Sequence, residues 1–303
     1  MKIIKAIIFL ILVSATNAIA QTDSIAANTD TSYWDKGGLI NINFSQVDLT
    51  NWNGGGKSSI SIGGLSNFKA NYEKGKNAWS NRLDLAYGLL RQGENENPFI
   101  KTDDNIILTS RYSRQLKKRI FISGMVDFRT QFDEGLNEEN EVISRFLAPG
   151  FLLANIGLTY RYKEIFSASF SPLSSKTTIV TDDSLSNAGA YGVEIGETTR
   201  FQGGINFSSS FQKDIWENVN LSTNLNMFAD YEKLGNIDIN WETALIFKIN
   251  SFLSASYSTQ LIYDDDIKSK EIVINEALGE FRYVPGIQFK SVMNIGLNIK
   301  IPY

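Results

Sequence analysis

The chain ends at residues 291–303 with the stretch SVMNIGLNIKIPY. Every second residue of this stretch is apolar or aromatic, and Asn294, Asn298 and Lys300 lie between them. Strict alternation is typical of a β-strand with one apolar and one polar face, because successive side chains of a strand point to opposite sides. The stretch therefore predicts a strand whose one face meets an apolar environment and which runs to a terminal aromatic residue.

The same period of two residues continues through the chain after Gly38, whereas helical spacing is not sustained. Many of the expected strands exceed the roughly 5–6 residues of soluble domains and match the roughly 9–11 residues of a tilted membrane-spanning strand. We expect about twelve strands from this pattern. Their approximate ranges are 39–47, 58–72, 78–91, 105–116, 120–133, 151–162, 165–173, 200–212, 219–231, 237–249, 253–263 and 286–302.

The connections between these strands alternate in length along most of the chain. Short connections are expected at 73–77, 117–119, 163–164, 213–218 and 250–252, and long ones at 92–104, 134–150, 174–199 and 264–285. Residues 48–57 are intermediate, and 232–236 are an exception. Short turns at one end and long loops at the other are typical of an outer-membrane barrel with both chain termini in the periplasm.

The two faces of the expected strands differ in charge. Runs such as Leu83-Leu85-Tyr87-Leu89 and Val219-Leu221-Thr223-Leu225-Met227 carry no charge and suit a lipid-facing side, where Arg or Lys costs roughly 2–4 kcal/mol at mid-membrane. Charged residues on the opposite face are expected to line the lumen, as a solute-selecting ring or as a salt-bridged network that fills it. These candidates are Arg82, Asp84, Arg111, Asp127, Arg129, Arg161, Asp238, Glu242 and Lys248.

These patterns predict an all-β fold, a closed antiparallel transmembrane β-barrel of about twelve strands of the outer-membrane type. Residues 1–20 have two lysines, an apolar run and Ala-Ile-Ala, the layout of a cleaved signal peptide. We expect a flexible polar segment at 21–37 and the barrel at 38–303. The chain would then reside as a monomer in the outer membrane of a Gram-negative bacterium, with lipid as its partner.

The composition excludes several kinds of chemistry. The chain has no His and no Cys, which removes His-dependent hydrolysis, the commonest zinc ligands and thiolate chemistry. Its net charge of −4 argues against a nucleic-acid partner. We expect no cofactor and no enzymatic activity, and a lipid-modifying enzyme that uses a carboxylate or a Ser–Lys pair is the remaining enzymatic alternative.

Two loop segments are further candidates. Asp264, Asp265 and Asp266 are oxygen donors that suit a hard cation such as Ca²⁺, and the alternative is a solvated acidic loop. Residues 174–199 form the longest expected connection, and they are expected to fold into the lumen as a constriction or to cap it.

Several motifs resemble a family of exported outer-membrane β-barrel-like proteins of unknown function from Bacteroidetes. They are SQVDLTNWNGGG (45–56), FKANYEKGKNAW (68–79), KTDDN (101–105), SRFLAPGF (144–151), SFSPLSSKTTIV (169–180), NAGAYGVEIGE (187–197), INWETAL (239–245) and STQLIYDDDI (258–267). The resemblance spans nearly all of the chain after the signal peptide, and it implies export and an outer-membrane barrel without an established activity.

The expected function is a narrow channel or transporter for small polar or anionic solutes. The alternative is a non-conducting barrel that serves as a membrane-anchored scaffold or binds partners at the surface. The terminal aromatic Tyr303 resembles the C-terminal signal that outer-membrane assembly machinery reads, so we expect that machinery to be a partner through the last strand.

Overall fold

The structure is a computed structural model that describes residues 32–49, 57–93, 98–137, 140–267, 270–275 and 280–302. The expected signal peptide at 1–20, residues 21–31 of the expected flexible segment and Tyr303 lie outside the described residues. Residues 33–303 form one compact unit. In the described part of the chain, no helix has the length and hydrophobicity needed to cross a membrane.

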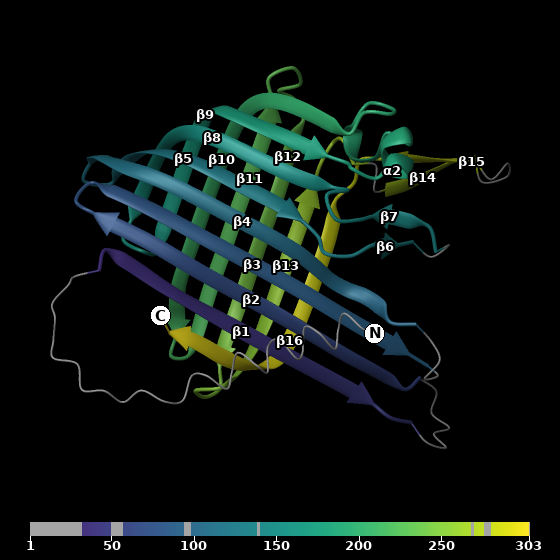
Figure 1. Ribbon diagram of the computed structural model, residues 1–303, viewed down its shortest axis with the longest axis horizontal. Helices are drawn as coiled ribbons and strands as arrows, with labels where there is room; N and C mark the ends of the chain where they lie inside the picture. Colours follow the sequence, from purple (N-terminus) through teal and green to yellow (C-terminus); the bar gives the residue numbers. More distant parts are fainter. Residues whose placement is uncertain are drawn as a thin grey trace. The chain divides into compact units, whose positions relative to one another are not determined.

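Twelve antiparallel strands form a closed barrel, which confirms the predicted fold (Figure 1). The order around the barrel is β1-β16-β13-β12-β11-β10-β9-β8-β5-β4-β3-β2. The barrel strands are β1 (Trp34–Val47), β2 (Ser59–Lys74), β3 (Asn77–Gln92), β4 (Ile100–Lys117), β5 (Ile120–Thr130), β8 (Gly150–Tyr162), β9 (Phe166–Ile179), β10 (Thr199–Trp216), β11 (Val219–Asp230), β12 (Ile237–Lys248), β13 (Leu253–Tyr263) and β16 (Gln288–Pro302).

The first and last strands close the barrel. β1 pairs with β16 from Gly37 opposite Pro302 to Asn43 opposite Gly296. Closure removes the open edge that would otherwise leave backbone N–H and C=O groups unpaired. β1 begins at Trp34, so the predicted start of the barrel at residue 38 is four residues too late, because the Trp34–Tyr72 pairing with β2 extends the strand.

The pleat of the strands sorts side chains into an outer apolar face and an inner polar face. On β16, Met293, Ile295, Leu297 and Ile299 each expose more than half of their surface on the outer face. Apolar side chains on a solvated surface are unfavourable, so a continuous outer belt of this kind suits hydrocarbon.

Short turns connect strands at one end of the barrel, which we call the short-turn end; the opposite end is the long-loop end. Gly75 and Asn218 lie in short turns with φ of 60° and 61°. Tight hairpin turns require positive φ, which Gly adopts freely and Asn tolerates.

β9 continues to Ile179, past the predicted end at residue 173. The pairing of β8 and β9 shifts register between Ile156 and Leu158, which is a bulge that accommodates Pro172. A Cβ atom at Gly157 would collide with the backbone of Phe170, so this position requires glycine. The polar residues 174–179 therefore belong to the barrel wall.

The long loops contain structure of their own. Two hairpins, β6 (Gly135–Leu136) with β7 (Val142–Ser144) and β14 (Lys270–Asn275) with β15 (Glu280–Val284), were not predicted. Residues 180–198, which we call the cap, contain α2 (Asp183–Asn187) and the 3-10 helix η1 (Ala190–Gly192). A small hydrophobic core consists of Ala148, Val180, Leu185 and Val193.

Candidate functional site

The interior of the barrel is the candidate site because it gathers the polar side chains of the wall. Asp127, Thr159 and Asn206 expose 6%, 1% and 0% of their surface. Buried polar groups are normally hydrogen-bonded, so their partners define what the interior can do.

Two of the predicted lumen arginines are paired with carboxylates on their own strands. Arg129 Nε lies 2.6 Å from Asp127 Oδ1 on β5, and Arg82 Nε lies 2.7 Å from Asp84 Oδ2 on β3. Residues two apart on a strand point to the same side, which is why these pairs form. Each arginine is neutralised by its own strand.

An ion pair between Arg129 and Glu242 spans the interior. Arg129 Nη1 on β5 lies 3.6 Å from Glu242 Oε1 on β12. These strands are five steps apart in the barrel order (β5, β8, β9, β10, β11, β12), nearly opposite each other among twelve. Gln260 Nε2 on β13 also donates to Glu242, at 3.3 Å. The Arg129–Glu242 pair therefore narrows the middle of the barrel.

Two other predicted arginines have no carboxylate partner among the described residues. Arg111 Nη1 donates to Ser169 Oγ at 2.9 Å, and Arg161 Nη2 donates to Ser113 Oγ at 2.7 Å. A chain of four buried hydroxyl groups joins the two arginines, with oxygen–oxygen distances of 2.8, 3.0 and 2.8 Å. The hydroxyl groups are those of Ser113, Ser123, Thr159 and Ser169. This layer supplies positive charge to the lumen without a neutralising ion pair.

At the long-loop end, Lys176 on β9 holds two acids from other elements. Its Nζ lies 2.6 Å from Asp238 Oδ2 on β12 and 2.8 Å from Asp264 Oδ2, just after β13. Asp238 is therefore a lumen residue whose partner, Lys176, was predicted to lie in the loop 174–199.

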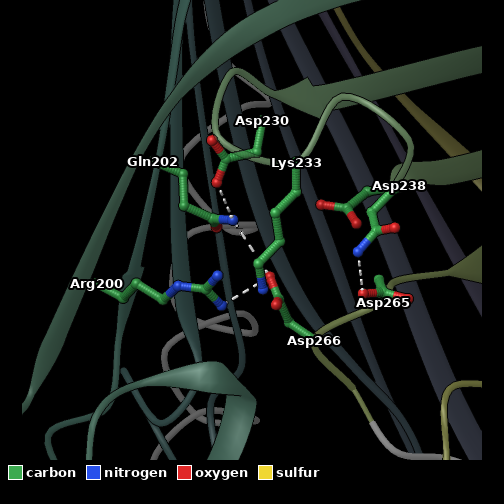
Figure 2. Close-up of a pocket in the computed structure, with 8 residues that line it drawn as sticks. Arg200, Gln202, Asp230, Lys233, Asp238, Asp265 and Asp266 are labelled. Carbon is green, nitrogen blue, oxygen red and sulfur yellow. Dashed lines mark hydrogen bonds and ion pairs between the residues drawn. The ribbon is translucent and has the colours of Figure 1, made fainter.

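Next to Lys176 lies a second cluster of charged and amide groups (Figure 2). Arg200 Nη1 on β10 lies 2.7 Å from Asp266 Oδ2, and Gln202 Nε2 donates to Asp230 Oδ2 at 3.0 Å. Asn236 donates to Asp265. The space left inside the cluster is about 10 Å³, at the lower limit for one water molecule. The cluster fastens the loop after β13 to the wall and leaves no room for a solute.

The three consecutive acids proposed as calcium ligands point to three different partners. Asp264 faces Lys176, Asp265 faces Asn236, and Asp266 faces Arg200. In the part of the chain that the structure describes, no three His, Cys, Asp or Glu residues are grouped as metal ligands. The acids fasten the loop and do not converge on a common cation position.

A much larger free volume lies inside the wall formed by β16, β1, β2, β3 and β4. It measures about 340 Å³ and has both polar and apolar lining. Lys290 Nζ on β16 lies 3.0 Å from Asp103 Oδ1 on β4, and both residues line this cavity. Its lining includes Asn43, Ser61, Leu65, Leu90, Val292 and Asn294.

The remaining predicted lumen residue, Lys248, is exposed at the short-turn end of β12 and joins none of these clusters. The residues missed from sequence are Lys176, Arg200, Gln202 and the hydroxyl chain. Thr and Ile at 177–179 favour a strand and were a signal that β9 continues through Lys176.

The cap is fixed to the rim at the long-loop end. The Tyr191 hydroxyl donates to the backbone O of Ile143 at 2.5 Å, and burial raises the pKa of Tyr191 to about 12. Gly192 lies directly against Arg200 and Asp266. The cap therefore reaches the charged cluster of Figure 2.

Two family models match parts of the chain. Residues 44–136 match the model described as "Protein of unknown function (DUF3078)", and residues 150–272 match "Protein of unknown function, DUF481". No curated protein matches the sequence.

The fold is similar to those of several solved structures. An outer membrane channel from Pseudomonas putida F1 is 9% identical, with 93% of this chain and 100% of that chain covered and a TM-score of 0.39. The CymD monoaromatic hydrocarbon channel is 10% identical, with 90% and 89% covered and a TM-score of 0.34. The translocator domain of the autotransporter NalP from Neisseria meningitidis is 8% identical, with 97% and 95% covered and a TM-score of 0.34.

Proposed function

We propose that the chain is an outer-membrane β-barrel that acts as a narrow channel for small polar or anionic solutes and has no enzymatic role. The observation that carries this proposal is the cavity of about 340 Å³ inside a wall with polar side chains. A free volume of this size accommodates a small solute, and the Arg129–Glu242 pair narrows the interior elsewhere.

Support for the membrane location comes from the outer face. The exposed apolar side chains of β16 continue the pattern of the other strands, and hydrocarbon favours an outer wall of this composition. We place both termini in the periplasm because short turns are periplasmic in outer-membrane barrels. Lipid and the assembly machinery are the proposed partners, and a barrel closed by its own strands works as a monomer.

The preference for anions is supported by Arg111 and Arg161. Their guanidinium groups donate to hydroxyl groups and have no carboxylate within ion-pair distance among the described residues. Uncompensated charge in a low-dielectric lumen attracts solutes of the opposite sign.

Single-channel recording in planar bilayers tests the channel. Glu242→Gln removes the attraction that holds Arg129 across the interior, so we expect the conductance to rise by roughly twofold. Glu217→Gln is the matched control, because Glu217 lies in a short turn outside the lumen. A wild-type protein that inserts and shows no conductance, together with a silent Glu242→Gln variant, would overturn the proposal.

The second candidate function is a non-conducting barrel that anchors a scaffold in the membrane. The ion pair between nearly opposite strands favours it, because side chains that meet across a barrel obstruct conduction. This alternative predicts background conductance for the wild-type protein and for Glu242→Gln, and a loss of stability in that variant as Arg129 loses one partner.

A further inference from the structure

The pairing that closes the barrel covers only part of the two strands. β1 and β16 pair between Gly37–Asn43 and Gly296–Pro302. Residues 44–47 of β1 pair with β2 alone, and residues 288–295 of β16 pair with β13 alone. The two strands diverge toward the long-loop end in Figure 1. Among the described residues, the facing edges of β1 and β16 therefore have no ladder partner beyond Asn43.

Local packing explains where the pairing stops. The Asn41 side chain lies over Gly296 and donates to Asn298 Oδ1 at 3.0 Å, which joins the two strands. The Asn43 side chain instead lies over Gly63 of β2, in space that a Cβ atom would occupy. Two neighbouring inward asparagines thus turn to opposite strands, and the junction opens between them.

The cavity of about 340 Å³ lies directly behind this gap, because its lining comes from both sides of it. Asn43 belongs to β1, and Val292 and Asn294 belong to β16. Apolar side chains such as Leu65 and Leu90 share the lining with Ser61. Outside, Phe44 and Met293 flank the gap with 60% and 73% of their surface exposed.

Hydrocarbon does not tolerate unpaired strand edges, because each unsatisfied N–H or C=O costs several kcal/mol. Such backbone persists at membrane depth where it is buried in protein or lines a water-filled cavity. Here the amides of Asn43 and Asn294 and the hydroxyl of Ser61 lie at that border.

We propose that the gap between β1 and β16 is a lateral portal that joins the cavity to the surrounding bilayer and admits small amphipathic molecules. The apolar side chains of the cavity contact the body of such a molecule, and its hydrogen-bonding group meets the amide and hydroxyl groups at the portal. The proposal goes beyond conduction along the barrel axis and rests on the membrane location proposed above.

Single-cysteine variants test the portal, since the chain has no cysteine of its own. Val292→Cys places a bimane fluorophore in the cavity, and Ile295→Cys places one on the outer face. Met125 on β5 lies opposite Arg111 of β4 and is 7% exposed, so Met125→Cys places a third fluorophore on the inner wall away from the gap. The barrels are reconstituted in vesicles whose acyl chains carry bromine, a quencher confined to the bilayer. We expect strong quenching at position 295, comparable quenching at 292 and little at 125.

Each outcome is decisive. Quenching at position 295 without quenching at 292 would refute the portal but would still support the membrane location. No quenching at position 295 would refute the membrane location. Asn294→Cys is a second cavity reporter if Val292→Cys does not fold.

A thiol-protection experiment on the Val292→Cys and Ile295→Cys variants, without fluorophore, tests whether the cavity binds small amphipathic molecules. We expect 1-hexanol to protect the thiol of Val292→Cys saturably from a maleimide and to leave the thiol of Ile295→Cys unprotected. Equal labelling of both variants with and without hexanol refutes the amphipathic ligand.

Discussion

At the scale of single residues, what matters is whether a charged side chain already has a partner. Arg82 and Arg129 are each held by an aspartate two positions away on the same strand, so their charges are cancelled locally. Arg111 and Arg161 contact neutral hydroxyl groups. The four arginines of the inner wall therefore differ in net charge contribution. We expect the ion selectivity of the channel to depend on Arg111 and Arg161.

Replacing Arg111 or Arg161 by Gln should lower the preference of the channel for anions. Each change removes one uncompensated positive charge from the lumen, and we expect the anion-to-cation permeability ratio to fall on the order of threefold. The reversal potential in a KCl gradient measures this ratio. Arg119→Gln, in the short turn between β4 and β5, is the control, and equal effects of all three changes would contradict the assignment.

At the scale of elements, the direction in which a strand presents its side chains determines what a substitution does. Leu225 of β11 lies opposite Trp241 of β12, and its neighbour Asn224 lies opposite Glu242. Since Glu242 faces the interior, Asn224 does so as well and Leu225 faces outward.

Leu225→Arg should lower the free energy of unfolding in lipid by about 2–4 kcal/mol, because it places a guanidinium group against hydrocarbon. Asn224→Arg is the matched control: it introduces the same side chain one position away, beside a carboxylate, and should be much milder. Urea unfolding in lipid vesicles gives both values. Similar losses for the two variants would refute the assignment of faces.

The element scale also shows what could be predicted from sequence. Alternation of apolar and polar residues located all twelve barrel strands, because each strand has one face that must be apolar. It ended β9 too early, because Pro172 and a polar run resemble a loop, whereas a bulge and backbone pairing keep residues 174–179 in the wall. The Arg129–Glu242 pair could not be predicted, since the pattern gives faces but not which side chains meet across the interior.

At the scale of the whole molecule, the cap and the charged cluster are folded features at the long-loop end of the barrel. The cap shares a small hydrophobic core with Ala148, and the side chain of Asp182 accepts a hydrogen bond from the backbone N of Leu185 at 3.0 Å. Arg145 Nη1 lies 3.2 Å from Asp182 Oδ2 and joins the cap to the segment before β8. The cap is therefore a folded segment held to its neighbours by packing, hydrogen bonds and an ion pair.

Replacing residues 180–198 by a short Gly-Ser linker should raise the conductance severalfold if the cap restricts entry at this end, as removal of an obstruction does. The replacement leaves β9 and β10 intact, unlike a deletion of 174–199, which would remove Lys176 from the wall. Tyr191→Phe keeps the cap and loses only the bond to Ile143, so it should leave the conductance near the wild-type value. An unchanged conductance after the replacement would show that the cap is not the barrier.

The seam between β1 and β16 also sets the order of events during folding. The hydrogen bond between Asn41 and Asn298 joins residues 257 positions apart in the chain. Closing so long a loop costs roughly 4 kcal/mol more chain entropy than closing a turn of about four residues. Each of the short hairpins can form early, but the ring itself cannot be completed until its final strand arrives. Until β16 pairs with it, β1 has an unpaired edge that can form hydrogen bonds with a strand of another chain. The chain is therefore most prone to aggregation between the formation of β1 and the pairing of β16.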